Sequence, residues 1–219
     1  MPADDLFLLG RAPGLKRPLI RSELMLLFDL VRNRDLLDTL FYDGSIRRPG
    51  EFADLMQDAG TWVYAVCGAV PGPLRGRAPL AFCWLNNFSG RGAMIHFCVL
   101  SEGRERAEAI GRFVVRALLL AGPNRPVPRE LLTAESSEAA HLLSKVAAEP
   151  GPYCLDALFG LTPAPFRHAL AFVRKLGFQE KGRLPHAVTL RRDNRERTVS
   201  GVLTCLERKD LWKNSFQGE

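Results

Sequence analysis

Three arginines gather where an apolar, strand-like run gives way to a helical pattern. Residues 93–100 read AMIHFCVL, and Arg104, Arg106 and Arg112 follow in the next stretch. A helix that begins in this stretch has unpaired backbone N–H groups and the positive end of its dipole at its start. Such a terminus binds anions, phosphate groups in particular. The segment is therefore a candidate site for a phosphate-bearing ligand.

Two side chains of the same run could take part in acid–base or nucleophilic chemistry. His96 could act as a general base, because a histidine ordinarily titrates near neutral pH. Cys98 lies two residues further on and shares its face of the strand. Tyr153 and Asp156 flank the start of the next apolar run, and Tyr153 could donate a proton. His96, Cys98 and Tyr153 could each instead serve only as packing residues, and the sequence does not decide between the two roles.

The elements that must position these residues alternate in type along the chain. Helical spacing predicts three N-terminal helices, the first capped by Ser22, followed by three strands that form an antiparallel meander. A helix over 104–121 and an insertion over 122–152 come next. A strand, a helix ending at Leu176 and a terminal hairpin complete the pattern. The expected ranges are 22–31, 34–42 and 49–58 for the helices, 61–70, 79–86 and 93–100 for the meander, 137–148 for a helix in the insertion, 153–160 and 165–176 for the next strand and helix, 178–191 and 197–206 for the hairpin, and 209–219 for a loose tail.

Composition narrows the class of protein. The chain has 219 residues, of which 47% are hydrophobic and 25% charged, and this mixture is typical of globular proteins. No apolar run reaches the roughly 18 residues of a membrane span. The acidic start of the chain disfavours a signal peptide. We expect one cytoplasmic domain over residues 1–219 that does not bind a membrane.

Cysteine and histidine spacing argues against disulfides and metals. The five cysteines lie in apolar runs without a CxxC motif, which predicts buried, reduced thiols. The four histidines are scattered, so we predict no metal site. The cysteines are Cys67, Cys83, Cys98, Cys154 and Cys205.

The net charge of +6 is unevenly distributed. Residues 1–100 hold 11 basic and 10 acidic side chains, and residues 101–219 hold 19 and 14. A basic C-terminal half favours a polyanionic partner, either the phosphates of a cofactor or a nucleic acid. The densest basic cluster, residues 191–197, lies at the expected hairpin turn and alternates with acids. No aromatic residues lie between its arginines, so nucleic-acid binding is the less favoured alternative.

The order of elements and two motifs resemble the GCN5-related N-acetyltransferase (GNAT) family. Residues 160–163 resemble small bacterial or prophage-type members, and the terminal segment 177–208 resembles the subgroup that acetylates protein N-termini. The family's acetyl-CoA loop, Arg/Gln-x-x-Gly-x-Gly/Ala, corresponds to residues 106–111, RAEAIG. Its closing Lys-Leu-Gly-Phe corresponds to residues 175–178, and residues 182–184 also fit the family pattern. The resemblance covers about residues 20–207. It implies an α/β (α+β) fold with a mixed, mostly antiparallel sheet flanked by helices.

The resemblance also implies a mechanism. The strand before the loop would diverge from the next one and pair with the pantetheine arm of acetyl-CoA, and a primary amine would attack the thioester directly. An amide at Cys98 or Val99 would polarise the thioester carbonyl. The acceptor would be a small molecule or a protein N-terminus, and the enzyme a monomer or homodimer. The implied cofactor-binding residues are Phe97, Cys98, Val99, Arg104, Arg106, Ala107, Ala109, Ile110, Gly111 and Arg112, and the catalytic candidates are His96, Tyr153 and Cys98.

Four positions depart from the family pattern. Ala109 replaces the first loop glycine, and Glu108 puts a carboxylate beside the expected phosphates. Phe166 stands where an asparagine is frequent, and Val173 stands where a tyrosine often serves as general acid. These departures keep open an alternative in which the fold has lost catalysis and serves as a binding or structural module.

Overall fold

A seven-stranded sheet organises the computed structural model, which describes residues 6–12, 15–120, 155–192 and 195–211. The strand order is β1-β2-β3-β4-β5-β7-β6. All neighbouring strands pair antiparallel except β4 and β5, which are parallel. The strands are β1 Phe7–Arg11, β2 Trp62–Cys67, β3 Pro79–Ser89, β4 Gly92–Val99, β5 Ala157–Pro163, β6 Gln179–Arg192 and β7 Arg195–Glu207. The predicted mixed, mostly antiparallel sheet flanked by helices is confirmed.

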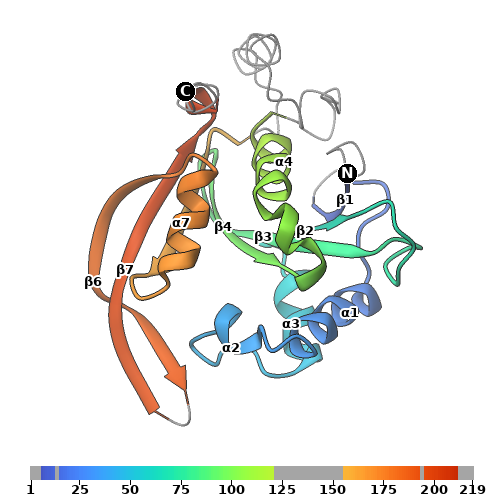
Figure 1. Cartoon of the computed structure of the whole chain (residues 1–219), viewed down its shortest axis with the longest axis horizontal. Helices are drawn as coiled ribbons and strands as arrows, with labels where there is room; N and C mark the ends of the chain where they lie inside the picture. Colours follow the sequence, from blue (N-terminus) through green and yellow to red (C-terminus); the bar gives the residue numbers. More distant parts are fainter. Residues whose placement is uncertain (1–5, 13–14, 121–154, 193–194, 212–219) are drawn as a thin grey trace.

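Helices cover both faces of the sheet (Figure 1). On one face, α4 (Ala107–Leu120) packs over the strands, with α7 (Arg167–Lys175) beside it. The opposite face carries α1 (Arg21–Arg32), the short α2 (Leu37–Leu40) and α3 (Pro49–Gln57). A short 3-10 helix, η2 (Ser101–Arg106), joins β4 to α4.

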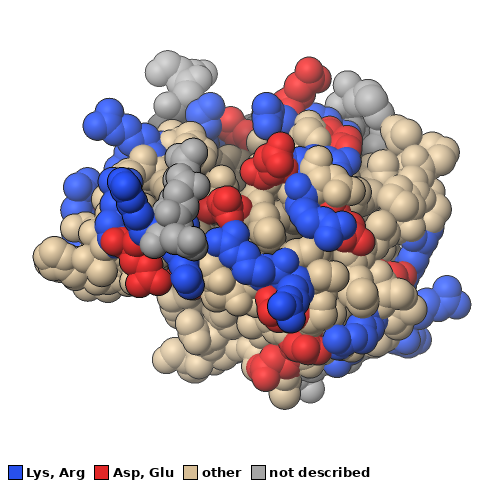
Figure 2. All heavy atoms as spheres, turned by 90° about the horizontal axis from the view of Figure 1, so that it is seen from below, with Lys and Arg blue, Asp and Glu red and all other residues tan. Residues whose placement is uncertain are grey.

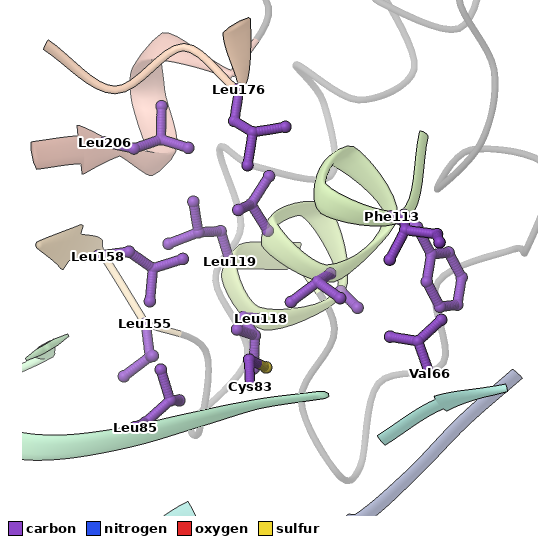
Figure 3. Close-up of a cluster of buried hydrophobic side chains, with 14 of the residues drawn as sticks. Val66, Cys83, Leu85, Phe113, Leu118, Leu119, Leu155, Leu158, Leu176 and Leu206 are labelled. Atoms are coloured by element: carbon purple, nitrogen blue, oxygen red, sulfur yellow. The ribbon is translucent and has the colours of Figure 1, made fainter. Parts of the chain in front are cut away.

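Two hydrophobic cores lie on the two faces. In the α4 core, Leu118 and Leu119 meet side chains from several strands and from the end of α7, including Leu158, Leu206 and Leu176 (Figure 3). The other core holds the apolar side of α1 and the aromatic side chains of β3. Because β3 is covered on both faces, its first seven residues are all buried, and they form a continuous apolar run without alternation.

The predicted helices and strands are present in the described ranges, with differences at their ends. The N-terminal strand β1 was not predicted. Ser22 does not cap α1, because the helix begins at Arg21 and the Ile20 N–H donates to the Glu23 carboxylate at 2.9 Å. The turn expected at 86–90 is wrong, since β3 continues to Ser89 and pairs there with Gly92.

The predicted insertion, with its helix over 137–148, lies outside the described residues, and so do Tyr153 and Cys154. Within the described ranges, no helix is both long and apolar enough to cross a membrane. The four described cysteines are free thiols, three of them buried, as predicted: Cys67, Cys83, Cys98 and Cys205.

Candidate functional site

The strands β4 and β5 pair over only three residues each. Gly92, Ala93 and Met94 lie opposite residues 157–159, and the ladder then ends. Both strands continue, β4 to Val99 and β5 to Pro163, each still paired with its other neighbour. The divergence expected from the resemblance is therefore present, and it leaves one edge of β4 without a described strand beside it from Ile95 onward.

The backbone alternation along β4 decides which groups face this open edge. The Arg91 carbonyl accepts from the Asp156 N–H at 2.7 Å and so points toward β5. The Leu100 N–H donates to the Leu80 carbonyl at 2.9 Å and so points toward β3. Because the N–H and C=O of one strand residue share an edge and successive residues alternate, Phe97 and Val99 present their backbone to the open edge. The backbone of Cys98 faces β3.

The β4–α4 junction begins with an exposed turn. Arg104 is exposed in η2, while Arg106 and the first α4 residues, Ala107 and Ala109, are partly exposed. Since α4 starts at Ala107, the positive end of its dipole lies in this segment, and the Ala107 N–H itself donates to the Arg104 carbonyl of η2. The junction therefore has the polarity that a diphosphate requires.

Ile110 and Gly111, both predicted to bind the cofactor, are buried in helix packing. The Ile110 side chain packs beside Gly103. A Cβ on Gly103 would lie 2.4 Å from the Leu80 carbonyl oxygen and 2.9 Å from Ile110 Cδ1. A Cβ on Gly111 would lie 2.6 Å from Leu176 Cδ2. The glycine at 111 thus allows α4 to approach the end of α7 closely.

The carboxylate of Glu108 is held between two cations. Its Oε1 accepts from Arg112 Nη2 at 2.5 Å, and its Oε2 lies 3.8 Å from Lys175 Nζ on α7. The charge that Glu108 places near the junction is therefore compensated. Because the Arg112 guanidinium already binds Glu108, it could contact a phosphate, as predicted, only while it also holds this carboxylate.

His96 packs on the face of β4 that carries α1 to α3. Its ring is stacked on Trp84, and Nε2 lies 3.1 Å from Asn86 Oδ1. An amide oxygen only accepts, so Nε2 carries the proton and Nδ1 keeps its lone pair. Burial lowers the pKa of His96 to about 4. The imidazole is thus neutral at pH 7 and can accept a hydrogen bond, but it holds a proton weakly.

Cys98 shares this face, as predicted, but it is packed among apolar side chains and only 6% exposed. Burial raises the pKa of its thiol to about 12. The thiolate is the nucleophilic form, so Cys98 in this environment has the character of a packing residue.

Aromatic residues meet just beyond the end of β5. Tyr42, which follows α2, makes an edge contact with Phe166 at the start of α7, with ring centroids 5.7 Å apart. Its carbonyl accepts from the Arg191 N–H of β6 at 2.6 Å. Burial, and secondarily the charge of Asp43, raise the pKa of Tyr42, so its hydroxyl stays protonated at neutral pH. Segments from three parts of the chain therefore converge here.

Two predicted positions belong to the framework. Val173 packs against the α4 core, in agreement with its lack of any acid–base group. Asp156 pairs with Arg91 and Arg208 at the joined end of β4 and β5, away from the divergence. The sequence interpretation missed Asn86, which partners His96, and Arg34, which pairs with Glu102 in η2. No local motif marks either residue, because each contact joins separate elements.

No protein-family model matches the sequence, and no curated protein matches it. Solved structures do match. A chimera of the spermidine N-acetyltransferase SpeG from Vibrio cholerae and hSSAT is 13% identical, with a TM-score of 0.58, and the match covers 96% of this chain and 99% of that one. The Vibrio cholerae enzyme in complex with CoA and spermine is 14% identical, with a TM-score of 0.57 and the same coverage.

The chain has the GNAT fold. The motifs at 106–111 and 175–178 carried the resemblance to this fold. The short β4–β5 ladder and the helix that follows β4 are two of the elements that the resemblance implied. Among the residues described, no group of three or more histidine, cysteine or acidic side chains could hold a metal ion.

Proposed function

We propose that this protein is an N-acetyltransferase that transfers an acetyl group from acetyl-CoA to a primary amine by direct attack in a ternary complex. The observation that carries the proposal is the edge of β4 beyond Met94, where no described strand pairs with it, followed at once by a helix start that carries Arg104 and Arg106. A pantetheine arm contains amide groups that can continue the ladder which β5 leaves. A diphosphate at its end would then reach the first turn of α4.

The thioester carbonyl needs a donor that gains strength as negative charge develops on the oxygen. Of the two amides predicted for this role, the N–H of Val99 faces the open edge, and that of Cys98 is directed toward β3. We assign the role to Val99. The chain's other contributions are positioning of the two substrates and exclusion of water.

The acceptor amine must lose a proton before or during attack. His96 Nδ1 is the described acceptor on the β4 face next to the divergence, although its low proton affinity makes it a relay more than a strong base. Tyr42 keeps its proton and is the described hydroxyl at the converging aromatic segments. It takes over as our candidate acid, because position 173 is a valine.

A binding module without catalysis is the alternative that the departures at Ala109, Phe166 and Val173 favour. Isothermal titration with acetyl-CoA, followed by a turnover assay, separates the two. Binding together with release of free CoA in the presence of an amine supports the enzyme. Failure to bind at millimolar acetyl-CoA overturns the proposal, and binding without turnover across the amine panel favours the module.

The amine panel should cover distinct acceptor classes. Spermidine and spermine belong in it, because a neighbour is a spermidine N-acetyltransferase that was solved with spermine. Small aromatic and aliphatic primary amines and peptides with free N-termini complete it. The dodecameric Vibrio cholerae enzyme also makes assembly worth measuring against the expected monomer or homodimer.

Nucleic-acid binding is the less favoured alternative. The face in Figure 2 carries blue and red side chains side by side, without a continuous basic field. In the hairpin cluster, Arg191 pairs with Glu196 at 3.7 Å. An affinity for RNA that falls steeply with salt would revive this alternative.

A further inference from the structure

Arg34, just after α1, clamps the turn that joins β4 to α4. Its Nε donates to Ser101 Oγ and to Glu102 Oε2, each at 2.9 Å, and its Nη2 donates to Glu102 Oε1. Its remaining nitrogen, Nη1, donates to the Leu30 carbonyl at 3.1 Å. The guanidinium is thus anchored on the Leu30 carbonyl of α1 and binds the Glu102 carboxylate in a bidentate manner. The Arg34 side chain is only 22% exposed.

The turn has little freedom on its other side. Gly103 is buried against β3, where a Cβ would lie 2.4 Å from the Leu80 carbonyl oxygen. Ser101 Oγ also donates to Glu102 Oε2 at 2.9 Å. With Arg34 present, η2 is fixed from the helix side and the sheet side together. Without it, the sheet-side contact of Gly103 and the Ser101–Glu102 hydrogen bond within the turn remain.

The clamp also controls charge. Glu102 is the acidic residue of the first turn of η2, two residues before Arg104, where the segment expected to meet a diphosphate begins. The hydrogen bond from Arg34 is the largest cause that holds the pKa of Glu102 down, to about 2, so the carboxylate is ionised at neutral pH. An ionised carboxylate without a partner would repel a diphosphate, and a bidentate guanidinium removes most of that repulsion.

We propose that Arg34 is a positioning residue for the diphosphate of acetyl-CoA, because it fixes the η2 turn and neutralises Glu102 from the turn that follows α1. This proposal rests on the proposed acetyl-CoA binding. Arg34 would act through the η2 turn and Glu102, so its effect is expected only on ligands that carry the diphosphate.

The test compares two ligands across matched variants. Acetyl-CoA and S-acetylpantetheine share the thioester and its arm, but only the first has the diphosphate. Arg34→Ala should weaken acetyl-CoA binding about tenfold or more and S-acetylpantetheine binding less than about twofold. Arg34→Lys should lie between, since lysine keeps the charge and loses the fork.

Arg75 provides the control, because it forms a comparable fork with Glu23 away from the turn. Its Nε and Nη2 donate to the two Glu23 oxygens at 2.6 and 2.8 Å. Arg75→Ala should leave both affinities within about twofold of the parent. Thermal melts of both variants check that they are folded at the assay temperature.

A second substitution separates the two parts of the clamp. Adding Glu102→Gln to Arg34→Ala removes the exposed negative charge without restoring the hydrogen bonds from residue 34 to the turn. Partial recovery of acetyl-CoA affinity is expected, with the rest of the loss assigned to the released turn. Recovery can be read directly as a ratio of dissociation constants.

Three results with the variants would overturn the proposal about Arg34. The first is an Arg34→Ala affinity for acetyl-CoA equal to that of the parent. The second is an equal loss for both ligands, which means general loosening. The third is the same loss in Arg75→Ala. If the parent protein binds S-acetylpantetheine and acetyl-CoA equally, the diphosphate role is also lost. If it binds neither, the proposed function itself fails, so the two failures are distinguishable.

Discussion

The rings of Trp84 and His96 are stacked, with centroids 4.5 Å apart and planes that differ by 4°. The two residues are opposite each other on β3 and β4. Cross-strand aromatic pairs of this kind stabilise a sheet. Here the pair also places one titratable ring, His96, in an apolar setting that lowers its pKa.

The first prediction concerns pH. The folded-state pKa of His96 is about 4, below the ordinary value near 6.5, so the unfolded chain binds more protons between these values. The free energy of unfolding should therefore fall as pH drops through this window, by about 3 kcal/mol from this residue at pH 4.5. Urea unfolding of the parent and of His96→Phe, which keeps a stacked ring, measures it. Equal pH slopes for the two proteins would contradict the assignment.

The second prediction concerns the open strand edge. Val99→Pro removes one N–H that faces this edge without removing a hydrogen bond to β3. With the proposed role for that amide, kcat should fall about 100-fold to 1,000-fold. Val99→Ala is the matched control, because it trims the side chain and keeps the N–H, and it should retain most of the activity. A folded Val99→Pro protein with parental kcat would rule out this donor.

The third prediction concerns Cys98. Since burial raises the pKa of its thiol to about 12, an alkylating reagent at pH 7 should modify the partly exposed Cys205 well before Cys98. Peptide mass mapping of a time course gives the order. Cys98→Ala should cost about 1–2 kcal/mol of stability through lost packing, with kcat unchanged. A large loss of kcat in that variant would give Cys98 a chemical role after all.

The fourth prediction separates packing from ligand binding at Gly111. Gly111→Ala places a methyl group 2.6 Å from Leu176 Cδ2, and the strain should outweigh the gain in helix propensity, with a net loss of about 1–2 kcal/mol. Gly50→Ala in α3 is the control, since its Cβ meets only Arg21 Nη2 at 3.7 Å, and it should stabilise slightly. Thermal unfolding of both proteins is the measurement. Destabilisation of the same size in both would remove the packing explanation.

The parts of the fold that could be predicted are those in which one local pattern dominates. The apolar spacing of α1 and the change from strand to helix after residue 100 are visible in the sequence and present in the structure. The turn chemistry of residues 86–90 was misleading. Asn87 does adopt a left-handed conformation, with φ of 49°, but the register shift there lets β3 continue instead of ending.

The candidate site could be proposed from the sequence, but the contacts of its residues could not. The motif at 106–111 marks the helix start, yet it does not reveal that Ile110 and Gly111 face the protein core. That distinction depends on where α7 and β3 come to lie. The Arg34–Glu102 pair joins residues 68 positions apart, so no local pattern could indicate it. The partner of His96 was hidden for the same reason, because register alone brings Asn86 beside it.

The strand order also bears on how the chain can be made. Although β7 follows β6 in the sequence, it lies between β5 and β6 in the sheet. During synthesis, β6 therefore emerges with no strand to pair with until β7 has followed it. The exposed edge of β5 and the waiting β6 are then open to wrong pairing, which is the hazard of long-range sheet contacts. A nascent chain halted before residue 195 should accordingly be prone to aggregate, even with both helical layers already synthesised.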